Sequence, residues 1–146
     1  MNAIRMYRLA RRLYLWHVPI MPKAIYWLIF LLYNSSIPYT AEIGPGTKFG
    51  YGGMGVVIHD RARIGSGCII SQQVTIGGRS RHYEVPVIGD NCYLGAGAKI
   101  LGPVVLGNHV VVGANAVVTH SVPDHCVVAG IPAKVIKQGI LMEDYV

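Results

Sequence analysis

The sequence predicts an all-β fold, a parallel β-helix built from six-residue repeats, with an α-helical segment before it. Three observations predict this fold. A large apolar residue recurs every six positions, a glycine usually follows it, and a small or β-branched residue stands four places after it. A fixed internal period is typical of architectures in which each repeat buries its faces against its neighbours.

The apolar column runs from position 43 to position 118, with three extra residues before position 58 and a histidine at position 82. Its twelve anchors are Ile43, Phe49, Ile58, Ile64, Ile70, Ile76, Ile88, Leu94, Ile100, Leu106, Val112 and Val118. Eight anchors are followed by glycine, at positions 44, 50, 65, 77, 89, 95, 107 and 113. A period of six fits a flat segment of about five residues followed by a corner. Three such six-residue units close one triangular coil.

The small column explains two of the three cysteines. Its members are Thr47, Gly53, Ala62, Cys68, Val74, Ser80, Cys92, Ala98, Val104, Val110, Ala116 and Val122. A small side chain at the corner avoids overpacking, and glycine beside the anchor removes a Cβ where the chain bends. Cys68 and Cys92 are therefore predicted to be buried structural thiols. The cysteines have no CxxC spacing, so no disulfide framework or metal site is predicted.

The chain is predicted to contain an N-terminal helical segment (1–37), the β-helix (38–137) and a C-terminal tail (138–146). Helical spacing covers 1–15 and 22–33, with a turn between them. Residues 24–33 are too apolar to stand alone in water. We expect them to pack on the first coil, on a neighbouring subunit or on lipid. Ten apolar residues are fewer than the roughly 20 that span a bilayer.

Composition narrows the class of protein. The chain has 146 residues, enough for one domain, of which 52% are hydrophobic, 14% charged and 18 are glycine. The net charge is +6, and five basic residues precede Glu42, the first acidic one. A basic, aromatic N-terminus fits an anionic membrane surface, nucleic acid or a solvated helix face. We expect a cytoplasmic protein that contacts the membrane peripherally, with no nucleic-acid partner.

Two segments break the repeat, and such breaks often mark function. After Ile58 the glycine position holds His59, followed by Asp60. The segment 77–87 places a histidine in the apolar column among charged residues, so it is predicted to leave the prism as a loop. A lone histidine can also be purely structural. We predict His82 and His59 as catalytic residues, and as substrate-binding residues Tyr51, Asp60, Arg81 and Glu84.

Four stretches then carry a family resemblance. They are SQQVTIGGRSRH (71–82), PVIGDNCYLGAGAKILGPVVLG (86–107), VVVGANAVVTHSVP (110–123) and VVAGIPAKVIK (127–137). With the rest of 43–137 they resemble the left-handed parallel β-helix acetyltransferases with hexapeptide repeats. The similarity is greatest to the serine acetyltransferase branch and its relatives in bacterial surface-polysaccharide gene clusters. The resemblance, not the spacing, implies a left-handed coil.

The resemblance also implies a homotrimer with active sites in the clefts between prisms, where a histidine base activates an acceptor hydroxyl for transfer from acetyl-CoA. His82 matches the family's loop histidine. The implied coenzyme A contacts are Ala96, Gly97, Ala114, Thr119, His120, Lys134 and Lys137, with the lysines suited to the nucleotide phosphates. Transfer would be direct, without a cysteine intermediate and without a metal.

The acceptor is the least determined part of the prediction. Serine acetyltransferases carry an Asp-His pair on the first coils, but its places fall near Ser36 and Tyr51–Gly52 here. That absence and the apolar N-terminus favour a hydroxyl of a sugar or surface-polysaccharide precursor, with L-serine as the alternative.

Two other classes of protein fit the sequence less well. A metal-dependent carbonic anhydrase would use histidines such as His120 and His125, and an ice-binding protein would need a regular threonine ladder.

Overall fold

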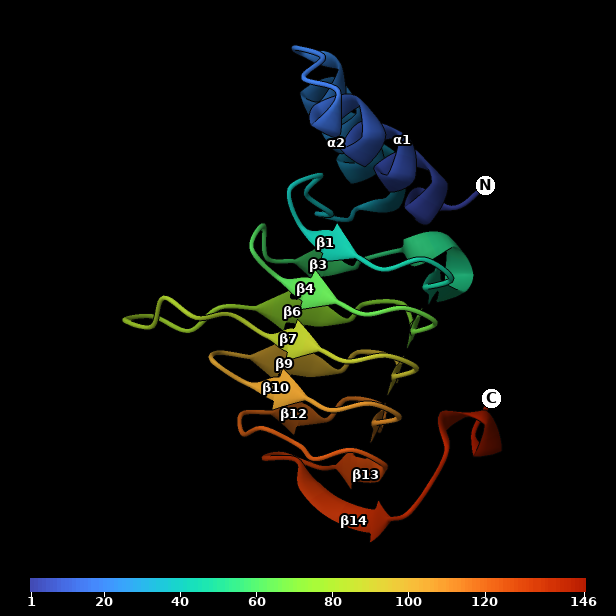
Figure 1. Ribbon diagram of the computed structural model, residues 1–146, viewed down its shortest axis with the longest axis vertical. Helices are drawn as coiled ribbons and strands as arrows, with labels where there is room; N and C mark the ends of the chain where they lie inside the picture. Colours follow the sequence, from blue (N-terminus) through green and yellow to red (C-terminus); the bar gives the residue numbers. More distant parts are fainter.

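The computed structural model describes all 146 residues as a three-sided prism of parallel strands with two α-helices at its N-terminal end (Figure 1). Face 1 contains β1 (Glu42–Ile43), β4 (Arg63–Ile64), β7 (Val87–Ile88) and β10 (Val105–Leu106). Face 2 contains β2 (Lys48–Phe49), β5 (Ile69–Ile70), β8 (Tyr93–Leu94), β11 (Val111–Val112), β13 (Cys126–Ala129) and β14 (Lys134–Gln138). Face 3 contains β3 (Val57–Ile58), β6 (Thr75–Gly77), β9 (Lys99–Leu101) and β12 (Val117–Val118).

The strands from β1 to β13 pair in parallel with the strand one coil away, and the anchors lie in register, as Ile64 does with Ile88. The chain passes from face 1 to face 2 to face 3 in every coil, and the coils wind in a left-handed sense (Figure 1). The corners therefore form three edges along the prism. We call them the 1–2, 2–3 and 3–1 edges after the faces that they join. The predicted fold class is confirmed.

The core is the column of anchors. All twelve are buried, none more than 6% exposed. The small column is buried as well, with one exception. Ser80 is exposed, because residues 78–86 leave the prism between β6 and β7. The loop predicted at 77–87 is thus confirmed, and counting Ser80 as a core position was wrong.

The glycine column has a different cause from the predicted one. A Cβ on Gly65 would lie 2.6 Å from the carbonyl oxygen of Gly89, and one on Gly44 would lie 2.6 Å from the carbonyl carbon of Gly65. Neither Gly44 nor Gly65 has a positive φ. The backbone of the next coil therefore excludes a side chain at these positions. Close stacking, rather than bending, requires the glycine.

Helix α1 (Ala3–Leu15) covers the open end of the first coil. Its buried Tyr7 hydroxyl donates to the carbonyl of Ala41, and Arg8 donates to the carbonyls of Ile43 and Gly44. Arg11 donates to Tyr39 O at 3.1 Å. Backbone carbonyls that have no coil above them are thus satisfied by helix side chains.

Helix α2 (Met21–Tyr33) packs against α1 and against the start of the prism through Ile25, Ile29 and Tyr33. One side of α2 therefore packs within the protein, which is one of the three expected alternatives. The opposite side of α2 remains exposed. Neither helix has the length and apolarity needed to cross a bilayer.

Two elements close the C-terminal end. Strand β14 runs antiparallel to β13 and ends the stack of parallel strands. Beyond it, Ile140 and Met142 pack on the outside of face 2 against Val111 and Val127, and the short helix η2 (Met142–Asp144) follows. The sequence contained no signal for this contact of the tail.

Candidate functional site

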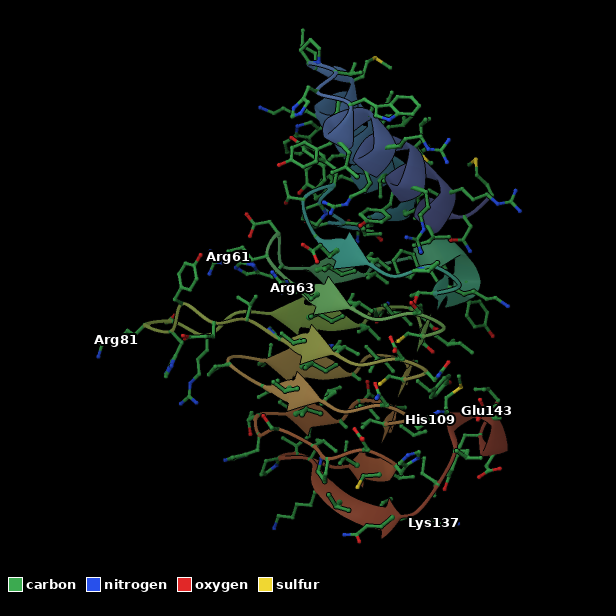
Figure 2. The ribbon with its side chains drawn as sticks, viewed as in Figure 1. Arg61, Arg63, Arg81, His109, Lys137 and Glu143 are labelled. Atoms are coloured by element: carbon green, nitrogen blue, oxygen red, sulfur yellow. The ribbon has the colours of Figure 1, made fainter.

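The 3–1 edge gathers most of the polar residues that the sequence analysis identified. From the N-terminal end, this edge contains residues 59–61 after β3, the loop 78–86, residues 102–104 and residues 119–121 after β12. Figure 2 shows the loop projecting away from the prism, with Arg81 at its tip and Arg61 near its base. The polar groups are thus stacked on one side of the molecule.

His59 is held beside Asp60. Its Nδ1 lies 2.9 Å from Oδ1 of Asp60 and 3.1 Å from the backbone nitrogen of Arg61. These contacts require different tautomers, because Nδ1 donates to a carboxylate but accepts from an N–H. Only the contact with Arg61 has hydrogen-bond geometry, with the backbone N–H donating to Nδ1. A ring whose proton turns to Asp60 carries it on Nδ1, which leaves Nε2 unprotonated and able to accept a proton.

Nε2 of His59 faces the root of the loop. A Cβ built on Gly78 would lie 3.4 Å from Cδ2 and 3.6 Å from Nε2 of His59. These distances are ordinary van der Waals contacts, so the backbone of Gly78 lies directly beside the ring. The imidazole is half-buried, with 27% of the side chain exposed, so a small molecule at the loop root can reach it.

Arg61 fixes the base of the loop. Its guanidinium lies 4.1 Å from the centroid of the Tyr83 ring and donates to Tyr83 O at 2.6 Å. Farther out, the backbone N–H of His82 donates to Arg79 O at 3.1 Å, which forms a turn. Arg81, His82 and Glu84 are exposed. Their predicted roles in catalysis and substrate binding remain predictions.

Two grooves flank this edge, one on each side of His59 along the prism. The upper one, of about 320 Å³, is lined by Lys23, Tyr26, Trp27, Pro38, Tyr39, Thr40 and Asp60. The lower one, of about 660 Å³, is lined by Gly78, Arg79, Ser80, Leu101, Thr119 and His120. A third hollow of about 420 Å³ lies on face 1 beside Arg61, Arg63 and Tyr83.

The predicted coenzyme A residues divide between two edges of face 3. Thr119 and His120 line the lower groove, with Thr119 Oγ1 3.2 Å from His120 Nδ1. Ala96, Gly97 and Ala114 lie on the 2–3 edge, across the width of face 3. Gly97 also has a structural reason to be glycine. Its φ is +72°, and a Cβ there would lie 2.1 Å from Asn115 Oδ1.

The remaining predicted residues are also apart from His59. Tyr51 lies in the short helix η1 (Gly50–Gly53) on the 2–3 edge, exposed and with a φ of 50°. Lys134 and Lys137 are exposed on β14. Within a single chain, the structure therefore brings together His59, Asp60 and the loop, but not Tyr51 or the two lysines.

Sequence reasoning missed Lys23 and Tyr26, because nothing in the repeat indicated that α2 lies beside Asp60. Tyr26 is fixed there by a hydrogen bond of 2.8 Å between its hydroxyl and Ser36 Oγ. Arg61 was missed as well. Its position directly after His59 and Asp60 was a signal that could have identified it.

The buried thiols lie away from this edge, and the two histidines that a carbonic anhydrase would use lie apart from each other. Cys68 and Cys92 are fully buried, as predicted. The hydrogen bond with Cys68 and burial raise the pKa of the Cys92 thiol far above its ordinary value. His120 lies on the 3–1 edge, whereas His125 lies on the 1–2 edge and stacks on His109 at 5.1 Å between ring centroids. The two histidines of the carbonic anhydrase reading thus occupy different corners.

Comparison with known proteins identifies the family. Residues 86–120 match the family described as bacterial transferase hexapeptide (six repeats). A serine acetyltransferase of Synechococcus elongatus is 39% identical over 142 residues, which cover 92% of this chain and 56% of that protein.

Solved structures agree. The serine acetyltransferase of Brucella abortus strain S19 in complex with coenzyme A is 30% identical with a TM-score of 0.87, covering 93% of this chain and 55% of that one. Soybean serine acetyltransferase complexed with serine is 33% identical with a TM-score of 0.84, covering 92% and 56%. This chain spans about half the length of the relatives that it matches.

These relatives correct one prediction. The prediction of a sugar or polysaccharide precursor as acceptor is wrong, because the similar proteins are serine acetyltransferases. They match this chain over nine-tenths of its length. The prediction rested on the missing Asp-His pair, whereas the structure places a different pair, His59 and Asp60, on the first coil. Six-residue repeats, a left-handed prism and these similarities together show that the chain belongs to the hexapeptide-repeat acetyltransferase family, with the serine acetyltransferases as its similar members.

Proposed function

We propose that the chain transfers the acetyl group of acetyl-CoA to the side-chain hydroxyl of L-serine. One structural observation carries the proposal. His59, paired with Asp60 at 2.9 Å, lies on the 3–1 edge between one groove lined by an acid and a base and another lined by Arg79, Thr119 and His120. The names of the similar proteins support the acceptor.

The proposed chemistry requires the tautomer of His59 that carries its proton on Nδ1, beside Asp60. Nε2 takes the proton of the serine hydroxyl as its oxygen attacks the thioester carbonyl, and Asp60 stabilises the imidazolium. When the C–S bond breaks, the imidazolium returns the proton to the sulfur of coenzyme A. General-base catalysis of this kind contributes roughly 10²–10⁴-fold. The buried cysteines have no part in this step.

The upper groove supports an amino acid as acceptor. It is lined by Lys23 and by Asp60, whose Oδ1 is engaged with His59. An ammonium group suits the carboxylate of serine, and the remaining carboxylate oxygen suits its α-ammonium. A neutral sugar would leave both charges without a partner. His59 and Asp60 would thereby take the place of the Asp-His pair that is missing at Tyr51 and Ser36.

The binding of coenzyme A is proposed to require a neighbouring copy. The lower groove offers Arg79 and His120 on the 3–1 edge, while Ala96, Gly97 and Ala114 lie on the 2–3 edge of the same face. If prisms assemble side by side as a homotrimer, the 3–1 edge of one chain faces the 2–3 edge of the next. One cleft then contains both sets, with Lys134 and Lys137 toward the nucleotide phosphates.

The proposal is tested by following thiol release from acetyl-CoA with and without L-serine, and by identifying O-acetylserine by mass spectrometry. We expect turnover with L-serine and none with serine methyl ester, which lacks the carboxylate that Lys23 would bind. Equal turnover with the ester, or no acetylation of serine, would contradict the proposal.

A further inference from the structure

The outer surface of the helical hairpin is apolar without a partner. We define the outer helical face as the exposed apolar residues of α2 and of the turn before it, which are Trp16, Ile20, Met21, Trp27, Leu28, Phe30, Leu31 and Leu32. Leu31 is 79% exposed and Ile20 is 81% exposed. A contiguous apolar surface of this kind marks an interaction site.

We propose that the outer helical face docks the protein on the surface of an anionic lipid bilayer. The proposal does not require the proposed transferase activity, but Trp27 and Lys23 also line the upper groove, so docking brings that groove close to the lipid surface. It rests on three features of the hairpin, namely its charge, its aromatic side chains and its length. The charge favours lipid over a second copy of this chain, the aromatic side chains suit the interface, and the length argues against a helix that spans the bilayer.

Charge is the first feature. Residues 1–41 contain five arginine or lysine residues and no aspartate or glutamate. Arg8 and Arg11 are engaged with backbone carbonyls of the first coils, and Arg5 lines a hollow with Lys48 and Phe49. Arg12 and Lys23 are exposed and flank the turn that contains Trp16 and Ile20 in the sequence. Exposed cations beside apolar side chains are attracted to anionic head groups. Two copies meeting through the same face would bring these like charges together.

Aromatic side chains are the second feature. Trp27 contacts Tyr26 at 5.3 Å and Phe30 at 5.5 Å between ring centroids, both edge to face. Trp27 is nevertheless 53% exposed and Phe30 45% exposed. Tryptophan and tyrosine are enriched at the boundary between membrane and water, where the ring meets acyl chains and its polar atom meets head groups.

The third feature is the length of α2. Its 13 residues extend about 20 Å at 1.5 Å per residue, which is less than the roughly 30 Å of a hydrocarbon core. A short helix with one exposed apolar side lies in the interface rather than across the bilayer. The hairpin forms the N-terminal end of the molecule (Figure 1), so docking there leaves the 3–1 edge of the lower coils in water.

The test is co-sedimentation of the full chain with vesicles. We expect binding to vesicles of phosphatidylglycerol and phosphatidylcholine, at least tenfold weaker binding to pure phosphatidylcholine, and loss of binding at about 0.5 M salt. Leu28→Gln/Leu31→Gln should weaken binding to the anionic vesicles at least tenfold. These leucines do not line the upper groove, so Trp27 and Lys23 remain intact.

A matched control removes two exposed aliphatic side chains at the other end of the chain. Ile136 and Leu141 are 67% and 48% exposed, and Ile136→Gln/Leu141→Gln should bind vesicles like the parent. Circular dichroism confirms that both double variants are folded. Absence of binding by the parent chain, or equal binding by both double variants, overturns the proposal. So does self-association without lipid that Leu28→Gln/Leu31→Gln abolishes, since the face would then belong to a second copy.

Discussion

Nδ1 of His59 lies 2.9 Å from Oδ1 of Asp60, the next residue in the chain, while Nε2 faces the root of a projecting loop. The carboxylate can therefore fix the tautomer whose free nitrogen faces that root. Neighbouring residues form this pair, so it does not depend on the relative placement of distant elements.

Asp60→Asn tests the role of the pair. The amide can donate to Nδ1, which would move the imidazole proton to Nε2 and remove the base. We expect kcat to fall at least ~10-fold and His59→Ala to lower it at least ~100-fold, with the Kd for coenzyme A unchanged. Steady-state kinetics and calorimetric titration measure both quantities. Glu143→Gln, which removes an exposed carboxylate on the tail, is the control and should leave kcat as it was.

His82→Ala separates the two candidate bases. If His59 is the base and His82 contacts the acceptor from the loop, the change should raise the KM for serine more than it lowers kcat. The same kinetic assay decides between them. A fall in kcat of ~100-fold for His82→Ala, with His59→Ala near the parent, would instead assign the base to His82.

Arg61→Ala should loosen the base of the loop, because it removes the stacking on Tyr83 and the hydrogen bond to its carbonyl. We expect a higher KM for serine, with the midpoint of thermal unfolding within a few degrees of the parent. Arg61→Lys keeps a cation but not the planar group, so it should recover only part of the loss. Full recovery by lysine would mean that charge alone is required.

Gly65→Ala tests the cause of the glycine column. A Cβ there would lie 2.3 Å from Asp90 Oδ1 and 2.6 Å from Gly89 O, so the coils must separate. We expect the free energy of unfolding in urea to fall by about 1–3 kcal/mol. Gly50→Ala is the matched control, because its Cβ would meet no atom closer than 3.5 Å. Equal effects of the two changes would show that stacking is not the cause.

The Cys92 thiol predicts a pH dependence. The hydrogen bond with Cys68 and burial raise its pKa in the folded state. The folded chain then keeps a proton on Cys92 that the unfolded chain releases, so the contribution of Cys92 to stability is present below pH 9 and is lost as the pH rises above it. The same hydrogen bond lowers the pKa of Cys68, which contributes with the opposite sign. Unfolding of the parent and of Cys92→Ala, compared from pH 7 to pH 10, measures the difference. Alkylation of Cys92 should likewise require unfolding.

The β-helix could be predicted because its signal is local and repeated, and each anchor from Ile43 to Val118 reports the same environment. The site was less accessible. His59 and Asp60 were identified where they break the pattern, but the groove depends on α2, and no local pattern places Lys23 beside them. Tyr51 was predicted as a substrate-binding residue, but it lies on another edge of the prism.

The acceptor was predicted wrongly for a related reason. The absence of the Asp-His pair at Ser36 and Tyr51 was taken as loss of a chemical function. In the structure, a pair of the same residue types stands one strand later, on the 3–1 edge. Sequence position alone does not reveal which corner of a coil a residue occupies, because three extra residues in 50–57 move the following chain by half a repeat.

The antiparallel strand β14 has a consequence for solubility. A stack of flat coils ends in a row of free amide and carbonyl groups, which is a template for joining another prism end to end. At the first coil, Arg8 and Arg11 donate hydrogen bonds to such carbonyl groups. At the last coil, β14 pairs with β13, and it runs in the antiparallel direction. A truncation after Gly130 would uncover the lower template, and we expect such a chain to polymerise into filaments along the prism axis.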